Sequence, residues 1–140
     1  MVEKGDVILP ADHNLKLYAL KAMILDDYDL AGKVPKVGEL IPKVEDRVKK
    51  IRKVWLSTAA NRCYVRATDH NQVLDALEAQ LEVNRAVGVK QDLADEIESM
   101  VRQHRRVKYG DVVMSSDHNE LVEIIKKQGR FLKEAYEALT

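Results

Sequence analysis

The stretch that decides the fold is GDVILPADHN at residues 5–14, because it returns with few changes as GDVVMSSDHN at residues 110–119. Both copies lead from a glycine through an apolar stretch to the tripeptide Asp-His-Asn, which occurs once more at residues 69–71. The tripeptide positions are Asp12, His13, Asn14, Asp69, His70, Asn71, Asp117, His118 and Asn119. A recurring element of this kind indicates related supersecondary units that stack to bury their apolar faces. Because the copies are unequally spaced, a compact bundle fits better than an open solenoid.

Apolar residues at helical spacing follow each copy of the tripeptide. Leu17, Leu20 and Ile24 have the 3.6-residue period after the first copy, with Tyr28 continuing the same face. Similar patterns predict helices from residue 12 or 14 to 29, and over residues 43–59, 69–86, 91–107 and 117–139. The sequence therefore predicts an all-α protein. We expect a four-helix-type bundle of related helical hairpins, about five helices in all, with short extended segments before the Asp-His-Asn motifs.

One segment, residues 31–42, interrupts this helical pattern. It contains Gly32, Pro35, Gly38 and Pro42, which disfavour a regular helix, and Pro42 suits the first turn of the helix that follows. We predict a crossover or arm here, within a single helical-bundle domain that spans residues 1–140. Its apolar residues would be unusual in a plain linker, so a partner is expected to cover them.

The composition narrows the class of protein. Charged residues make up 33% of the chain and apolar residues 46%, and the 23 basic residues equal the 23 acidic ones. This balance gives no global argument for nucleic acid or membrane. The single Cys63 excludes an intramolecular disulfide. No apolar run approaches the roughly 20 residues that cross a bilayer, and the N-terminus lacks a signal-peptide core. We expect a chain that is neither secreted nor inserted in a membrane.

The Asp-His-Asn motifs allow a structural and a functional interpretation. In the structural one, each aspartate is the N-cap of a helix, while the histidine and asparagine bond backbone groups of the preceding extended segment. Loss of Asp12 or Asp117 would then cost about 0.5–2 kcal/mol. In the functional one, His13, His70 and His118 converge on a metal ion. No nucleophile elbow, phosphate loop or paired catalytic carboxylates occur, so we favour the structural interpretation and expect neither catalysis nor a cofactor.

A basic stripe between residues 43 and 66 is the strongest candidate for a binding surface. Its cations are Lys43, Arg47, Lys49, Lys50, Arg52, Lys53, Arg62 and Arg66. Such a stripe suits phosphates, but acidic residues cluster elsewhere in the chain, and separate basic and acidic faces also suit contacts between identical copies. Self-association or a plain solvated face is the preferred interpretation of the stripe, and a small intracellular nucleic-acid-binding module is the alternative.

The Gly-Asp-Val element that leads into Asp-His-Asn and an amphipathic helix resembles a segment of virion structural proteins. It is similar to segments of phage tail and fibre proteins and of helical-bundle coat proteins of archaeal tailed spindle-shaped viruses. The match covers residues 5–14 and 110–119, whereas RCYV at residues 62–65 replaces Gly-Asp-Val before the middle copy. The resemblance implies a non-enzymatic coat or tail subunit that is made in the host cytoplasm, polymerises with copies of itself and resides in the virion.

Overall fold

In the computed structural model, the described part of the chain forms a bundle of five α-helices. The model describes residues 10–53, 65–104, 106–108 and 113–140, and these ranges contain no strand. The helices are α1 (Pro10–Ala31), α2 (Pro35–Lys49), α3 (Ala67–Val87), α4 (Gln91–Gln103) and α5 (Ser115–Leu139). The predicted all-α bundle of five helices is therefore confirmed. The residues before α3 and α5, Arg66 and Met114, have the extended backbone expected ahead of the motifs.

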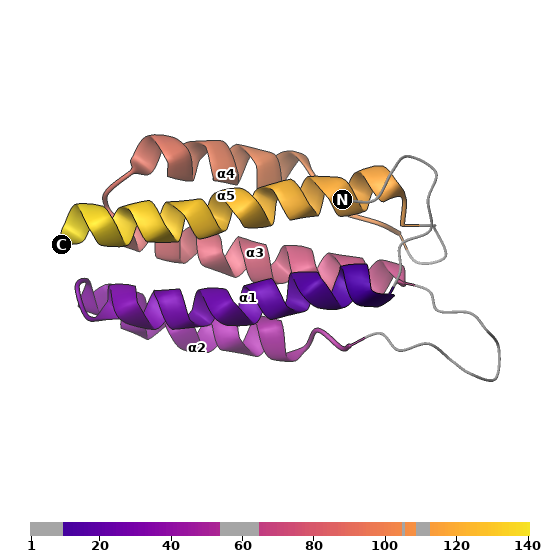
Figure 1. Cartoon of the computed structure of the whole chain (residues 1–140), viewed down its shortest axis with the longest axis horizontal. Helices are drawn as coiled ribbons and strands as arrows, with labels where there is room; N and C mark the ends of the chain where they lie inside the picture. Colours follow the sequence, from indigo (N-terminus) through magenta and orange to yellow (C-terminus); the bar gives the residue numbers. More distant parts are fainter. Residues whose placement is uncertain (1–9, 54–64, 105, 109–112) are drawn as a thin grey trace.

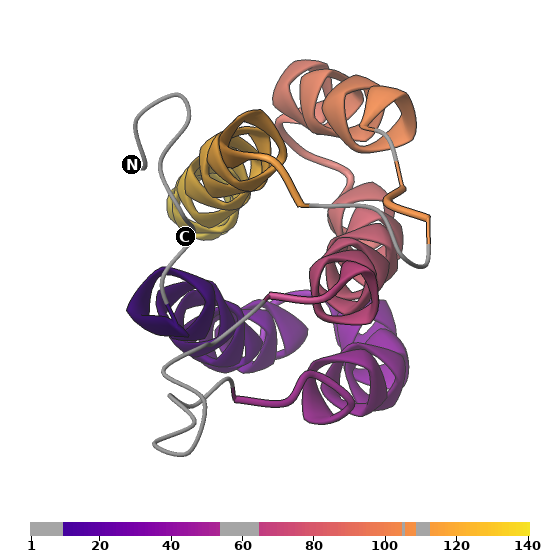
Figure 2. The same cartoon turned by 90° about the vertical axis from the view of Figure 1, so that its right-hand side faces the viewer.

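Consecutive helices alternate in direction, so that α1, α3 and α5 are parallel to one another and α2 and α4 run in the opposite direction (Figure 1). Seen from one end, α1, α3 and α5 surround the centre of the bundle, and α2 and α4 lie on either side of α3 (Figure 2). Helix α2 packs on α1 and α3, while α4 packs on α3 and α5. Since α2 and α4 do not touch each other, one face of α3 stays open between them.

Apolar side chains at helical spacing fill the centre of the bundle. Leu17 and Leu20 of α1, Leu77 of α3, and Leu121 and Phe131 of α5 are almost fully buried. Burial of one such side chain contributes about 1.5–3 kcal/mol. This core holds α1, α3 and α5 in fixed register, and the register places the three motifs relative to one another.

The structure corrects the prediction for residues 31–42, because most of this segment is helical. Only a short turn separates α1 from α2, which begins at Pro35 and includes Pro42. Burial of Val37, Ile41 and Val44 on one face stabilises the helix. The ring of Pro42 is exposed, so its missing N–H costs a backbone hydrogen bond without disturbing the packing. The apolar residues of the predicted arm are thus explained by intrachain burial.

The ends of two helices also differ from the prediction. Helix α2 ends at Lys49 and the chain leaves it through Ile51; residues 54–59, the rest of the predicted helix, lie outside the described ranges. Helix α4 ends at Gln103, because His104 is extended and turns back into the bundle. Gly88, in the left-handed conformation that glycine adopts easily, ends α3.

Candidate functional site

The three Asp-His-Asn motifs lie at the same end of the bundle, because they begin three parallel helices (Figure 1). In each case the aspartate is the third residue of its helix, counted from Pro10, Ala67 or Ser115. The three histidines are all buried, and the three asparagines are half-buried. The repeat therefore places polar side chains in equivalent positions at one end of the molecule.

The aspartates support the helix starts, but not as N-caps. Asp69 Oδ2 accepts the backbone N–H of Arg66 at 2.9 Å, and Asp117 Oδ2 accepts that of Met114 at 3.0 Å. Each helix begins two residues before its motif, and Asp69 and Asp117 bond back to the capping residue as the third residue of a capping box does. For these two motifs the predicted N-cap position is wrong by three residues, because the helix already begins at Ala67 and at Ser115.

His13 and Asn71 bond to the segment that follows a neighbouring helix, not to the preceding extended segment as predicted. The side chain of Asn71 pairs with both backbone groups of Val107, donating from Nδ2 at 2.7 Å and accepting at Oδ1 at 3.0 Å. His13 Nε2 lies 3.2 Å from the carbonyl oxygen of Arg52. Each contact joins the start of one helix to the chain that leaves its antiparallel neighbour. The motifs therefore close the open ends of the hairpins α1–α2 and α3–α4.

A chain of hydrogen bonds links His70 to α5 through His104. The Nε2 atoms of His70 and His104 are 2.9 Å apart, and His104 Nδ1 lies 2.7 Å from Glu120 Oε2. With Glu120 accepting from Nδ1, a neutral His104 accepts at Nε2 from His70. The pairing of His104 with His70 is not predictable from the sequence, because 34 positions separate the two residues and only the turn after α4 brings them together.

The motif histidines have different partners and do not converge on one point. His13 faces the carbonyl of Arg52, whereas His70 faces His104. Among the described residues, no group of three His, Cys, Asp or Glu side chains is placed to hold a metal ion. The metal-centred interpretation thus has no ligand set in this part of the chain.

The basic stripe does not form one continuous surface. Asp69, which is fully buried, lies 2.8 Å from both Nε and Nη2 of Arg52, and Arg66 approaches the same carboxylate at 3.6 Å. Lys43 pairs with Glu82, and Lys50 pairs with Asp46. Of the remaining cations, Arg47 lines a groove, Lys49 is exposed and Lys53 lies over the ring of Tyr18, while Arg62 lies outside the described residues. Intrachain ion pairs thus neutralise half of the predicted stripe.

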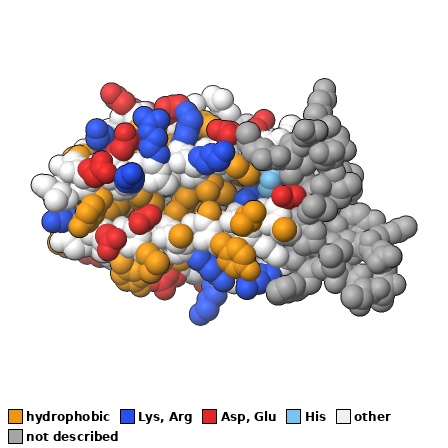
Figure 3. All heavy atoms as spheres, viewed as in Figure 1, with side chains coloured by type: hydrophobic (Ala, Val, Ile, Leu, Met, Phe, Trp, Pro, Cys, Tyr) orange, Lys and Arg blue, Asp and Glu red, His pale blue; other side chains and the backbone are white. Residues whose placement is uncertain are grey.

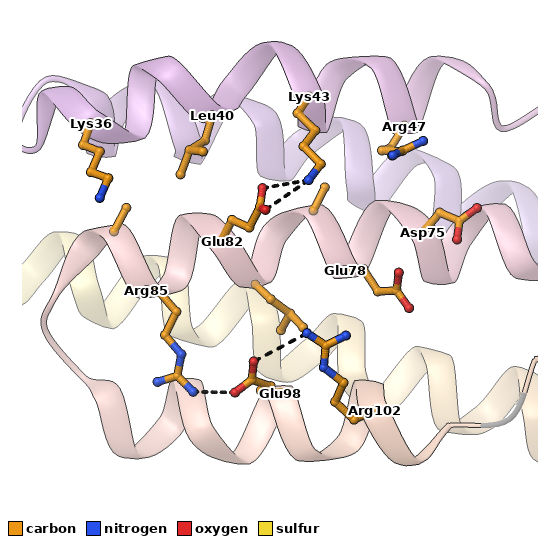
Figure 4. A pocket seen from close by; sticks show the side chains of 13 residues that line it. Lys36, Leu40, Lys43, Arg47, Asp75, Glu78, Glu82, Arg85, Glu98 and Arg102 are labelled. Carbon is orange, nitrogen blue, oxygen red and sulfur yellow. Dashed lines mark hydrogen bonds and ion pairs between the residues drawn. The ribbon is translucent and has the colours of Figure 1, made fainter.

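The open face of α3 forms the floor of a groove of about 620 Å³ between α2 and α4 (Figure 4). Opposite charges are interleaved along it. Lys43 of α2 contacts both carboxylate oxygens of Glu82 at 3.0 Å, and Arg85 of α3 pairs with Glu98 of α4 at 2.7 Å. Arg106, in the segment after α4, pairs with Asp75 and Glu78 of α3. The groove is therefore braced by ion pairs, and the acids that line it all pair with cations of the same chain.

Helix α1 buries ionisable groups near its beginning. Lys16 is 3% exposed, and its Nζ finds no hydrogen-bond partner in the described part of the chain. Burial lowers the pKa of Lys16 to about 8. Burial, together with the nearby charge of Lys16, lowers the pKa of His118 to about 4 and also lowers the pKa of His13. The two histidines are therefore neutral at pH 7, beside a lysine whose charge is poorly compensated.

A layer of buried polar side chains also crosses the middle of the bundle. Gln80 Nε2 of α3 donates to Asp27 Oδ2 of α1 at 2.6 Å, and Gln128 of α5 exchanges hydrogen bonds with Asn84 of α3 at 2.7 and 2.8 Å. Gln128 Nε2 also lies 3.4 Å from Gln80 Oε1, which joins the two pairs. Burial raises the pKa of Asp27 to about 7, although the bond from Gln80 opposes this shift. The layer fixes the relative positions of the three central helices, since each side chain has its partner in only one register.

The outer face of α1 is apolar and open to solvent. Leu15 is 64% exposed, Tyr18 47% and Leu25 67%, and Ala22 lies between them on the same face. Figure 3 shows hydrophobic side chains along the length of the bundle on the side that α1 occupies. We call Leu15, Tyr18, Ala22 and Leu25 the α1 stripe. Tyr28, predicted to face inward, is 54% exposed and bonds to Glu45 of α2.

The exposure of the α1 stripe was not predicted from the sequence, although the pattern of residues in α1 contains a signal for it. Apolar residues occur on every side of α1, and an amphipathic surface helix would be polar on one side. Charged residues such as Lys21, Asp26 and Asp27 are spread around the helix as well, so the sequence gives α1 no distinct polar side. The fold of one copy buries only the inner side.

Comparison with known protein families, with curated proteins and with solved structures found no match for this chain. Within the described ranges, no helix is both long and apolar enough to cross a membrane. The geometry of the described residues and the sequence resemblance are therefore the basis for a functional proposal.

Proposed function

We propose that this protein is a non-enzymatic structural subunit that assembles with copies of itself, and that it serves as a coat or tail subunit of a virion. The observation that carries self-assembly is the α1 stripe. Leu15 and Leu25 each leave about two thirds of their surface in water, on a helix whose opposite side is in the core. Contiguous apolar surface of this kind is typical of contact sites between proteins.

The rest of the bundle is suited to act as a rigid building block. The motifs close both hairpins at one end, and the layer of Asp27, Gln80, Asn84 and Gln128 locks the register of the central helices. A subunit that is repeated many times in a shell or tail needs a fixed shape, because small errors accumulate along an assembly. The virion role itself rests on the sequence resemblance of residues 5–14 and 110–119.

Nucleic-acid binding through residues 43–66 receives less support. Lys43, Lys50, Arg52 and Arg66 each pair with a carboxylate of this chain. A phosphate would have to displace those carboxylates before it gained the same contacts. A protein with this arrangement is a weaker phosphate ligand than its count of basic residues indicates.

Light scattering after size exclusion, over a range of protein and salt concentrations, tests the proposal. The expected result is a molar mass that rises with concentration to at least a dimer without added nucleic acid. Leu15→Ser combined with Leu25→Ser should reduce the association constant about 100-fold, since each substitution exposes a polar group in an apolar contact.

Met114→Ser is the matched control, because Met114 is 56% exposed but lies at the start of α5, outside the α1 stripe. It should leave the mass profile unchanged. A strict monomer at all concentrations overturns the proposal. A monomer that changes mass only when DNA or RNA is added would support the nucleic-acid-binding alternative instead.

A further inference from the structure

We propose that the α1 stripe of one copy packs against the α1 stripe of a second copy, antiparallel, about a two-fold axis that passes between Tyr18 and Ala22. This inference rests on the proposed self-assembly and specifies its first contact. A two-fold contact is self-complementary, so one surface patch serves both partners.

The spacing of the stripe is the first argument, because it reads the same in both directions. Leu15 is three residues from Tyr18, Tyr18 is four residues from Ala22, and Ala22 is three residues from Leu25. Spacings that alternate between three and four are those of two helices packed side by side along an apolar seam. Turning the second helix end to end places Leu15 opposite Leu25 and Tyr18 opposite Ala22, so every stripe residue meets an apolar partner.

The sizes of the paired side chains are the second argument. In the antiparallel pair, the large ring of Tyr18 meets the small Ala22 of the other copy, and this happens twice around the axis. In a parallel pair, Tyr18 would meet Tyr18 and Ala22 would meet Ala22, giving one crowded layer and one empty layer. Layers that match large with small side chains pack without voids.

The charges beside the stripe are the third argument. Asp26 and Asp29 are exposed at the C-terminal end of the stripe, whereas Lys53 lies over the ring of Tyr18, its Nζ 5.1 Å from the ring centre, near the N-terminal end. In a parallel pair, each carboxylate would face the identical carboxylate of the other copy. The antiparallel pair instead sets both acids against the end that holds Lys53 and the positive pole of the α1 dipole. Lys21 lies near the axis in both orientations and does not distinguish them.

The groove between α2 and α4 is a less suitable surface for a second copy. Its acids are already bonded to lysines and arginines of the same chain, as for Lys43 with Glu82 and Arg85 with Glu98. A partner there would have to replace satisfied ion pairs. A partner on the α1 stripe removes apolar area from water without breaking any contact described for the monomer.

A swap of the central pair tests the orientation. Tyr18→Ala alone and Ala22→Tyr alone should each weaken self-association about tenfold, by leaving a void or by crowding two large rings. The double variant restores a large residue opposite a small one only in the antiparallel pair. Its dissociation constant should return to within about threefold of that of the unmodified protein. All four proteins are checked for helix content by circular dichroism, since both positions are exposed and tolerate substitution.

Disulfide trapping provides an independent measurement in a Cys63→Ser background. After mild oxidation of a mixture of Leu15→Cys and Leu25→Cys proteins, mass spectrometry should find the mixed 15–25 disulfide in excess over 15–15 and 25–25. Lys36→Cys is the control, because this exposed residue of α2 lies on the opposite face and should remain unlinked.

The outcomes separate this inference from the proposed function. Oligomers whose affinity is not restored by the swap, or that give mainly 15–15 disulfides, would overturn the antiparallel pair and leave self-assembly intact. A protein that stays monomeric throughout would overturn both. Restoration by the swap together with the mixed disulfide supports both.

Discussion

Helices α1 and α3 begin with the same motif, run parallel and end at the same side of the bundle. They differ in how polar and apolar side chains are distributed between the outer and the inner face. The outer face of α3 is charged, and its acids pair with α2 and with Arg106. In its middle, the inner polar groups Gln80 and Asn84 are neutral amides with partners, and at its start the buried Asp69 and His70 contact Arg52 and His104. The outer face of α1 is apolar and exposed. Its inner face buries Lys16 and Asp27, each with an atom that has no hydrogen-bond partner among the described residues.

Under the proposed self-association, α3 has its partners within one copy, whereas α1 completes its contacts on a second copy. A helix that exposes leucines on one face and buries ionisable groups on the other lowers the stability of the monomer through both faces. Such a helix persists when an interaction outside the monomer offsets the cost, and a second copy on the α1 stripe would supply that interaction.

The largest effect on stability is expected from Asp27→Asn. The pKa of Asp27 is raised from 3.8 to about 7, so folding favours the protonated carboxyl. The free energy of unfolding of the native protein therefore falls as pH rises from about 4 to about 7, where the buried group becomes charged. Asparagine cannot ionise and still accepts from Gln80. At pH 8 the variant should be more stable by about 4 kcal/mol, since each pKa unit corresponds to 1.36 kcal/mol.

Urea unfolding at pH 4 and at pH 8 measures this effect. At pH 4 the native carboxyl is already protonated, and the two proteins should have nearly equal stability. A gain of the same size at both pH values would show that the charge of Asp27 is not the cause. In that case, the contrast between the buried groups of α1 and the satisfied amides of α3 would no longer hold.

A smaller loss is expected at the start of α3 from Asp69→Ala. The carboxylate is fully buried, accepts the N–H of Arg66 and contacts two nitrogens of Arg52. The loss should be about 3 kcal/mol, larger than for an ordinary cap, because the bonds between the buried carboxylate and the half-exposed Arg52 are lost as well. Since the carbonyl of Arg52 also bonds His13 of α1, the loss should loosen the starts of both helices.

Asp69→Asn separates the two contributions of this side chain. It keeps an oxygen for the N–H of Arg66 but removes the charge that holds Arg52, and it should cost about 1–2 kcal/mol. Chemical denaturation at pH 7 measures both variants. If asparagine and alanine cost the same, the ion pair with Arg52 is essential to the site; if asparagine is neutral, the ion pair contributes nothing and Asp69 is only a cap.

Much of the fold could be predicted because it follows from local patterns. The repeated motif marked three helix starts to within two or three residues, and the apolar period gave α3 and α5 almost at their observed bounds. The sequence predicts a start of α2 that is too late, because Pro35 and Pro42 disfavour a regular helix. The burial of Val37 and Ile41 against α1 and α3 outweighed one lost hydrogen bond, and such tertiary packing is not visible in the local sequence.

The candidate site could be predicted less well, because it depends on distances between residues that are far apart in the chain. The sequence marked His70 and Asn71 as polar residues at a helix start, but their partners His104 and Val107 are set by the turn after α4. The burial of Lys16 and Asp27 is not predictable from the sequence, because charged residues are normally exposed. The exposure of the α1 stripe is not predictable for the complementary reason, since apolar residues are normally assigned to the core.

The smallest effect is expected in the groove, from the pair formed by Lys43 and Glu82. Both side chains are 48% exposed and meet at 3.0 Å, so solvent screens their attraction. A double-mutant cycle with Lys43→Ala and Glu82→Ala should give a coupling energy of about 0.3 kcal/mol, falling further in 1 M salt. Lys36→Ala, at another cation of the groove, is the control. A coupling above about 1 kcal/mol would mean that the groove acts as one cooperative network rather than as separate surface pairs. The outer face of α3 would then hold the bundle together as its core does, and a partner could enter the groove only by unfolding part of it.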